Sequence, residues 1–310
     1  MVANRLFLSD NPLDFTHVTN ENAYLQYARE KSMHFEYARK MKFIGALLLC
    51  AGVMGCQSNA PRTFEQYNPR QAESNNMALV GYVDLQARSA YQPIIQKQGD
   101  RYIAYVGHHG GTTAVPKPVN LMTGQAEFNG TSIIDVTNPA QPKYLKHIPG
   151  EEGAGEKGGG QMVRVCGGAA FKGDAGAFYL LRTFGNTAHE IWNVTDPANP
   201  KLMNRIPSGQ DTHKNWWECD TGIAYLVSGL PGWRTRRMTS IYDLSDPAKP
   251  VHIRDFGLPG QQPGATGTVP TELHGAISTG RAGNRVYFGY GTNKGGILQI
   301  VDREKLLVGP

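Results

Sequence analysis

The sequence predicts an all-β fold built from repeated four-stranded antiparallel sheets, arranged as the blades of a β-propeller. Glycine and proline are abundant in the 310 residues (37 and 19), and long helical patterns are scarce after residue 50. This composition is typical of turn-rich β proteins. A similar stretch also recurs at intervals of roughly 50 to 60 residues, which is the period of repeat architectures. Repeated four-stranded units that cover their own edges form propellers.

The repeated stretch reads DVTNPAQP from Asp135, NVTDPANP from Asn193 and DLSDPAKP from Asp243. In each copy a short Asx side chain precedes a proline (Asn138, Asp196 and Asp246). Asx followed by proline favours a type I turn. A second proline follows three residues later (Pro142, Pro200 and Pro250). Because proline cannot donate to a sheet ladder, this position suits the beginning of an edge strand. The stretch therefore predicts a hairpin between the third and the outermost strand of each unit.

The remaining strands follow from apolar segments on either side of this turn. First strands are expected in MVRVCGG, NWWECDTG and LHGAIST, and second strands in RYIAYVG, AFYLLRTF, IAYLVSG and RVYFGYG. Third strands are expected in TSIIDV, EIWNV, TSIYDL and ILQIVD, and outer strands in KYLKHI, KLMNRI and VHIRDF. The fourth copy, LQIVDREKLL, lacks the Asx-Pro turn, and the sequence ends before a further strand. We expect ALVGYVDL, residues 78–85, to supply an outer strand that closes the ring.

TSIIDVTNPAQP and its copies resemble the LVIVD repeat of secreted bacterial β-propellers, over residues 78–302. The resemblance implies a ring of about seven blades, of which residues 78–310 would be an incomplete part. A small ring closed by the N-terminal strand is the alternative. The resemblance implies a fold and no particular activity.

The segment MKFIGALLLCAGVMGCQSNAP, residues 41–61, predicts export. Its apolar run is too short to span a bilayer and fits a signal peptide over residues 41–55. VMGC resembles the lipobox of bacterial lipoproteins, which implies cleavage before Cys56 and acylation of its thiol, as with palmitate. Gln57 then implies the outer membrane, facing the periplasm or the cell surface. Residues 56–77 would be a flexible tether. Residues 1–40 are interpreted as an over-extended gene start or, alternatively, a genuine leader.

Charge and cysteine content narrow the partners. The formal charge of +5 is scattered, and the densest basic run, WRTRRM, is too short for a nucleic-acid footprint. No nucleic-acid partner is therefore expected. Cys166 and Cys219 occupy similar places in successive repeats. In an oxidising compartment they form either a disulfide, two buried thiols or a soft metal site.

Two histidines precede first strands, His213 and His274, while His108 and His109 end a second strand. Innermost strands line the axis of a propeller, so these side chains are expected at one end of the channel. With nearby carboxylates (Asp211, Glu218 and Glu272), they predict a copper or zinc site or a general base. The structural alternative is that each imidazole bonds neighbouring backbone.

Three arginines at or after second strands, Arg182, Arg234 and Arg237, are candidates for a solvent-facing clamp on an anion; pairing with surface acids is the alternative. GAGEKG, residues 153–158, is expected to be a flexible loop because a strand follows it. These features support two hypotheses. The first is an envelope lipoprotein whose propeller binds a protein or small molecule. The second is a periplasmic metal-dependent oxidoreductase, with copper as the candidate metal.

Overall fold

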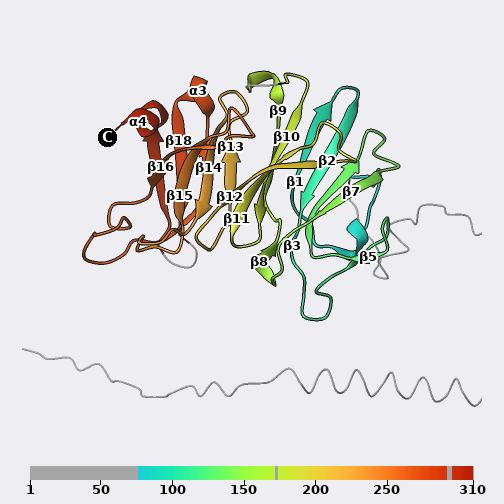
Figure 1. The fold of residues 1–310 in the computed structure, drawn as a ribbon, viewed down its shortest axis with the longest axis horizontal. Helices are drawn as coiled ribbons and strands as arrows, with labels where there is room; N and C mark the ends of the chain where they lie inside the picture. The colour runs from blue at the N-terminus through green and yellow to red at the C-terminus, as the bar shows by residue number, and fades with distance from the viewer. Residues whose placement is uncertain (1–75, 172–173, 292–294, 310) are drawn as a thin grey trace, which may run out of the picture. The chain divides into compact units, whose positions relative to one another are not determined.

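The structure, a computed structural model, describes residues 76–171, 174–291 and 295–309 (Figure 1). The chain divides into two compact units, Met1–Ala60 and Pro61–Pro310, and the described residues all belong to the second. The signal peptide, Cys56 and most of the tether lie outside the described residues. Within the described residues, no helix has both the length and the apolar character needed to cross a membrane.

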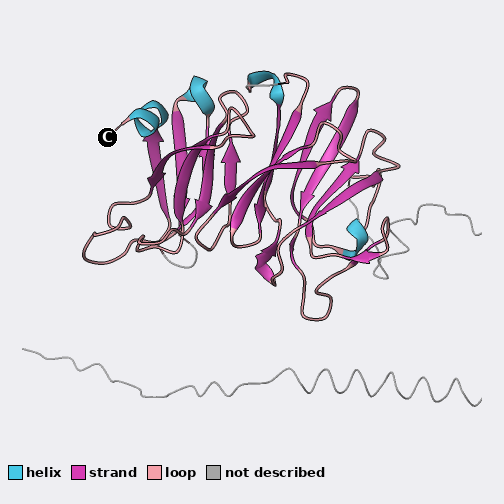
Figure 2. Cartoon of the chain, viewed as in Figure 1, coloured by secondary structure: helices cyan, strands magenta, loops and turns pink. Residues whose placement is uncertain are grey.

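The described residues form four antiparallel sheets, one for each predicted repeat (Figure 2). The first contains β1 (Tyr91–Gln98), β2 (Arg101–Gly107), β6 (Gly130–Asp135) and β7 (Lys143–Pro149). The second contains β9 (Val163–Gly167), β10 (Phe178–Phe184), β11 (Ala188–Asn193) and β12 (Lys201–Pro207). The third contains β13 (Asn215–Trp217), β14 (Ile223–Ser228), β15 (Met238–Asp243) and β16 (Val251–Phe256). The fourth contains β17 (Leu273–Ser278), β18 (Arg285–Tyr290) and β19 (Ile297–Asp302). The all-β prediction is confirmed.

Successive sheets pack against one another through alternating side chains of their central strands. Leu180 of β10 joins a core with β2 of the first sheet, while the adjacent Leu181 joins a core with β14 of the third. Tyr225 and Leu226 divide in the same way between the fourth and the second sheet. Successive side chains of a strand point to opposite faces. Each central strand can therefore be buried on both faces, and each such side chain contributes about 1.5–3 kcal/mol.

The four sheets follow one another in chain order, from the teal first sheet to the red fourth one in Figure 1. Their first strands, β1, β9, β13 and β17, contact one another in that same order. Strand β9 contacts both β1 and β13, and β13 contacts β17. The first strands of all four sheets are thus neighbours, whereas the outer strands are more exposed.

The Asx-Pro turns form as the sequence predicts. The carbonyl of Asn138 accepts from the Gln141 amide at 3.0 Å, and the carbonyls of Asp196 and Asp246 make the equivalent bonds. Each Asx side chain also accepts from the amide two residues later. In the fourth sheet, Asp302 instead accepts from the Lys305 amide at 3.0 Å and caps helix α4 (Arg303–Val308).

Three local predictions are wrong. Residues 78–84 form no strand, and a 3-10 helix, η1 (Leu85–Ala87), follows them, so they do not supply the predicted closing strand. Strand β1 was not predicted, because Pro93 lies within it; the structure accommodates this proline at an irregularity between Tyr91 and Ile94. GAGEKG is part of strand β8 (Gly155–Gly159), which pairs with β3 (His109–Gly110).

Small elements complete the described fold. They are β4 (Val119–Asn120), β5 (Gln125–Ala126), η2 (Gly168–Ala170) and α3 (Gly280–Gly283). Where β3 and β8 approach, Gly159 has a φ of 79°, and a Cβ there would lie 2.3 Å from the His108 carbonyl oxygen. Only glycine fits this contact.

Candidate functional site

One cavity of about 450 Å³, here called the central cavity, is lined by residues from all four sheets. Gln92 reaches it from β1, Arg164 from β9 and Asn215 from β13. Gly275 of β17 and Leu298 of β19 complete its circumference. Its walls combine cationic and amide groups with apolar side chains, which is the usual make-up of a small-molecule site.

The polar groups at β13 lack partners within the described protein. Asn215 is 1% exposed, and neither its amide nitrogen nor its amide oxygen has a hydrogen-bond partner among the described residues. The same holds for both ring nitrogens of His213, which is also 1% exposed. A buried polar group without a partner costs about 1–3 kcal/mol. Such a cluster is therefore a candidate for contact with a ligand or with ordered water.

Two cations line the same cavity. The ammonium of Lys214 donates to the Tyr91 hydroxyl and lies 4.6 Å from the centroid of the Tyr91 ring. The guanidinium of Arg164 lies 5.0 Å from the ring of Trp216 and donates to the Val163 carbonyl. Neither cation forms an ion pair within the described part of the chain. No carboxylate is among the described residues that line the cavity.

His213 and His274 come together, with ring centroids 4.9 Å apart in an edge-on arrangement. Burial lowers the pKa of His213 to about 3, and Arg237, His274, Lys214 and Arg236 lower it further by their charge. The pKa of His274 is also lowered, by burial and then by Lys214 and Arg237. Both imidazoles are therefore neutral at pH 7, in positively charged surroundings.

These surroundings do not fit the predicted copper or zinc site. Among the described residues, no group of three or more His, Cys, Asp or Glu side chains is placed to hold a metal ion. The Glu156 carboxylate lies 3.7 Å from Nδ1 of His213, and Arg237 also contacts it. Cations beside the imidazoles disfavour a divalent metal by charge repulsion.

The other two predicted histidines have different surroundings. His108 is buried, bonds the Ser89 carbonyl, and makes a 2.6 Å bond to the Ser132 hydroxyl. Its ring centroid is 5.9 Å from that of His147, a histidine that no sequence pattern singled out. His109 packs on Tyr91, with centroids 4.5 Å apart. His108 therefore has the structural role that was the alternative prediction.

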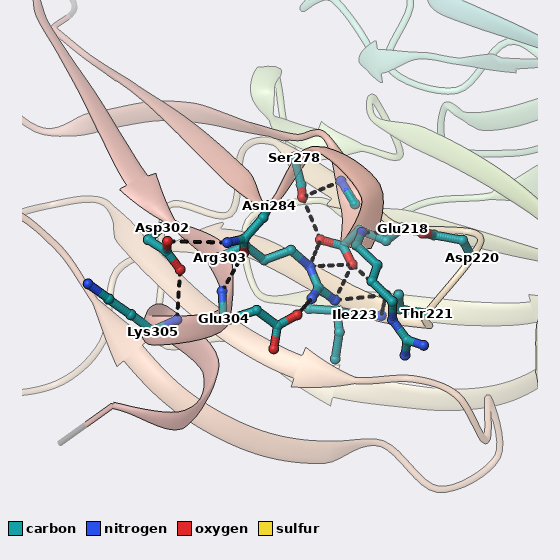
Figure 3. A network of polar contacts seen from close by, with 12 residues as sticks. Glu218, Asp220, Thr221, Ile223, Ser278, Asn284, Asp302, Arg303, Glu304 and Lys305 are labelled. Atoms are coloured by element: carbon teal, nitrogen blue, oxygen red, sulfur yellow. Dashed lines mark hydrogen bonds and ion pairs between the residues drawn. The ribbon is translucent and has the colours of Figure 1, made fainter.

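The predicted carboxylate partners bind arginines instead. Glu272 accepts two bonds from Arg236, at 2.5 and 2.7 Å, and Asp211 lies 3.8 Å from the same guanidinium. Figure 3 shows Glu218 in a network that joins the third and fourth sheets. Its carboxylate accepts from Arg303 at 2.7 Å and from Ser278 at 2.5 Å. Both members of the Glu218–Arg303 pair are buried, so this network is a structural connection.

The predicted anion clamp is wrong, because its three arginines point to separate places. Arg182 is fully buried, bonds Glu190 at 2.8 and 2.9 Å, and donates to the carbonyls of Ile148 and Pro149. Arg234 donates to the carbonyls of Gly260 and Gly267. Arg237 is buried and contacts the Asp211 carbonyl and Glu156. Charge alone had suggested exposure, but each guanidinium found oxygen partners in the fold.

Three residues of the cavity, Arg164, Lys214 and Asn215, were not predicted from the sequence. Arg164 lies within the apolar segment MVRVC, and Lys214 and Asn215 lie where the expected strand NWWECDTG begins. A polar residue inside an innermost strand was the one available signal.

A smaller cavity of about 210 Å³, between the second and third sheets, is a weaker candidate. There Asp255 bonds both Ser240 and His252, so the histidine is not placed to activate the serine.

Cys166 and Cys219 form a disulfide, with Cα atoms 5.2 Å apart. Cys166 lies in β9 and Cys219 follows β13, so the bond joins the innermost strands of the second and third sheets. The first of the three sequence-based alternatives is the one that the structure contains.

Comparisons with known proteins add little. No family model and no curated protein matches the chain. One solved structure, described as a complex of BT0996 and RGII, has 10% identity and a TM-score of 0.40 over 72% of each chain. Another, a functionally unknown protein from Desulfotomaculum acetoxidans, has 12% identity and a TM-score of 0.31, over 68% of this chain and 61% of its own.

Proposed function

We propose that this chain is a lipid-anchored β-propeller of the bacterial envelope that acts as a binding module, with a small-molecule ligand in the central cavity. The order of the sheets supports the propeller, because consecutive sheets pack face to face and their first strands are neighbours. Radially repeated four-stranded sheets have this arrangement. The lipid anchor rests on the VMGC segment and on Cys56.

The observation that carries the binding role is the polar group of Asn215. This amide is buried, without a partner among the described residues, and lines a cavity to which all four sheets contribute. A fold gives no function by itself, so the binding role depends on this site. The competing hypothesis, a metal-dependent oxidoreductase, has only the His213–His274 pair in its favour.

A thermal-shift screen of the full chain against small metabolites tests the binding role. A ligand that binds only the folded state, at a hundred times its Kd, stabilises that state by about 2.7 kcal/mol. We expect one class of compound to raise the Tm of the wild type but not that of Gly275→Val. A Cβ at position 275 would lie 3.4 Å from Cγ of Lys214, so the added side chain would project toward this lysine and narrow the cavity.

Gly167→Val is the matched control, because Gly167 lies in β9 outside the cavity lining and a Cβ there meets only the Phe178 ring at ordinary contact distance. The control should respond to ligand like the wild type. If no compound shifts the Tm of the wild type, or if Gly275→Val responds equally, the proposed function is wrong.

A further inference from the structure

Lys214 and Arg164 differ from most of the other buried cations of this fold. Arg182, Arg237 and Arg303 each contact a carboxylate, at distances between 2.7 and 3.4 Å. Lys214 and Arg164 have no such partner among the described residues, and both line the central cavity. A cavity with two cations and no carboxylate in its described lining favours an anion, because partial burial strengthens the interaction between charges.

The Asn215 amide narrows the choice of anion. Its nitrogen requires an acceptor, which a carboxylate or phosphate supplies, but its oxygen requires a donor. Both atoms are buried without a partner within the described residues. A bare carboxylate has no hydrogen to donate. An ammonium group could donate, but Lys214 and Arg164 would repel it, so a hydroxyl is the donor that suits this cavity.

We propose that the central cavity binds a hydroxycarboxylate, with the carboxylate toward Lys214 and Arg164 and a hydroxyl at Asn215. This inference rests on the proposed binding function and adds the chemical class of the ligand. The apolar wall formed by Met162, Ile277 and Tyr290 would face the carbon skeleton. A volume of about 450 Å³ is within the range of sites for small organic molecules.

Calorimetric titration of the full chain with two matched series of probes tests this ligand class. Glucuronate, glucose and glucosamine share a sugar ring but carry a carboxylate, no charge and an ammonium group. Lactate and propionate share a carboxylate, but only lactate has a hydroxyl. In at least one series the hydroxycarboxylate should bind ten-fold or more tightly than its matched partners.

Variants identify the groups responsible. Lys214→Met should weaken binding of the hydroxycarboxylate at least ten-fold. Asn215→Leu should reduce the preference for the hydroxyl-bearing probe over its partner, which a general loss of packing would not do. Lys249→Met removes an exposed lysine of an Asx-Pro turn and should leave binding unchanged. Circular dichroism and thermal unfolding establish that each variant is folded.

Two failures are distinguishable. If glucose or propionate binds as tightly as its hydroxycarboxylate partner, and Gly275→Val abolishes that binding, the cavity is a binding site but the proposed ligand class is wrong. The class is also wrong if folded Lys214→Met binds the hydroxycarboxylate like the wild type. If neither series binds and the metabolite screen is silent, the binding function itself is wrong.

Discussion

His108 makes the stability of the protein sensitive to acid. Burial lowers the pKa of this histidine to about 4, against the small opposing effect of its bond to Ser89. Below an unfolded pKa of about 6.5, the unfolded chain takes up a proton that the folded protein refuses. The free energy of unfolding therefore falls as the pH drops from 7 toward 4, by about 2 kcal/mol at pH 5 for this one group. Urea unfolding at pH 7 and pH 5 should show a smaller loss in His108→Gln than in the wild type. An identical loss would contradict the assignment.

The buried pair of Glu218 and Arg303 supports a second prediction at the scale of single residues. Burial alone would raise the pKa of Glu218, but the bonds from Arg303, Ser278 and Thr221 outweigh it, and the pKa is lowered. Arg303→Met leaves the carboxylate buried without its cation and should cost about 4 kcal/mol of unfolding free energy. Adding Glu218→Gln removes that charge, so the double variant should be more stable than Arg303→Met alone. Additive losses in urea unfolding would exclude this coupling.

At the scale of elements, the disulfide between Cys166 and Cys219 fixes β9 to the segment that follows β13. The bond closes a loop with a sequence separation of 53 residues. In the chain-entropy model, such a crosslink contributes about 4 kcal/mol by restricting the unfolded chain. We expect the double substitution Cys166→Ala with Cys219→Ala to lower the unfolding free energy by about that amount, and a reductant to have no further effect on it. Equal stability with and without the disulfide would contradict this role.

Strand order was predictable because its determinants are local. The Asx-Pro turns fix where each third strand ends, and alternating pairs such as Leu180 and Leu181 fix the strand between two cores. Strand β1 was not predictable, because its backbone accommodates Pro93 through an irregularity that no short pattern announces. The 78–85 segment failed for the opposite reason. Its alternating apolar residues suggest a strand, yet no neighbouring edge in the described part of the fold pairs with it.

At the scale of the whole molecule, equivalent positions in successive repeats predicted which side chains meet. That reasoning correctly brought His213 to His274, because β13 and β17 are neighbours. It did not reveal that Arg182 is buried beside Glu190, since that pairing depends on the register of β10 and β11. The importance of Asn215 was equally hidden. An unpartnered amide is recognised only when every surrounding group has been placed.

The whole-molecule prediction concerns the attachment of the propeller to a membrane. Cys56 follows a short apolar run and a small residue, which is the position acylated in lipoproteins, and this segment lies outside the described residues. Since each buried CH₂ is worth about 0.8 kcal/mol, two or three acyl chains would hold the protein firmly on the bilayer. Cys56→Ser should therefore abolish labelling with palmitate in a bacterial host and release the protein from the membrane fraction. Cys50→Ser, in the apolar run, is the matched control and should retain both. Palmitate that remains on Cys56→Ser would show that the thiol of Cys56 is not the anchor, and the cavity would then have to be considered in a protein free of the membrane.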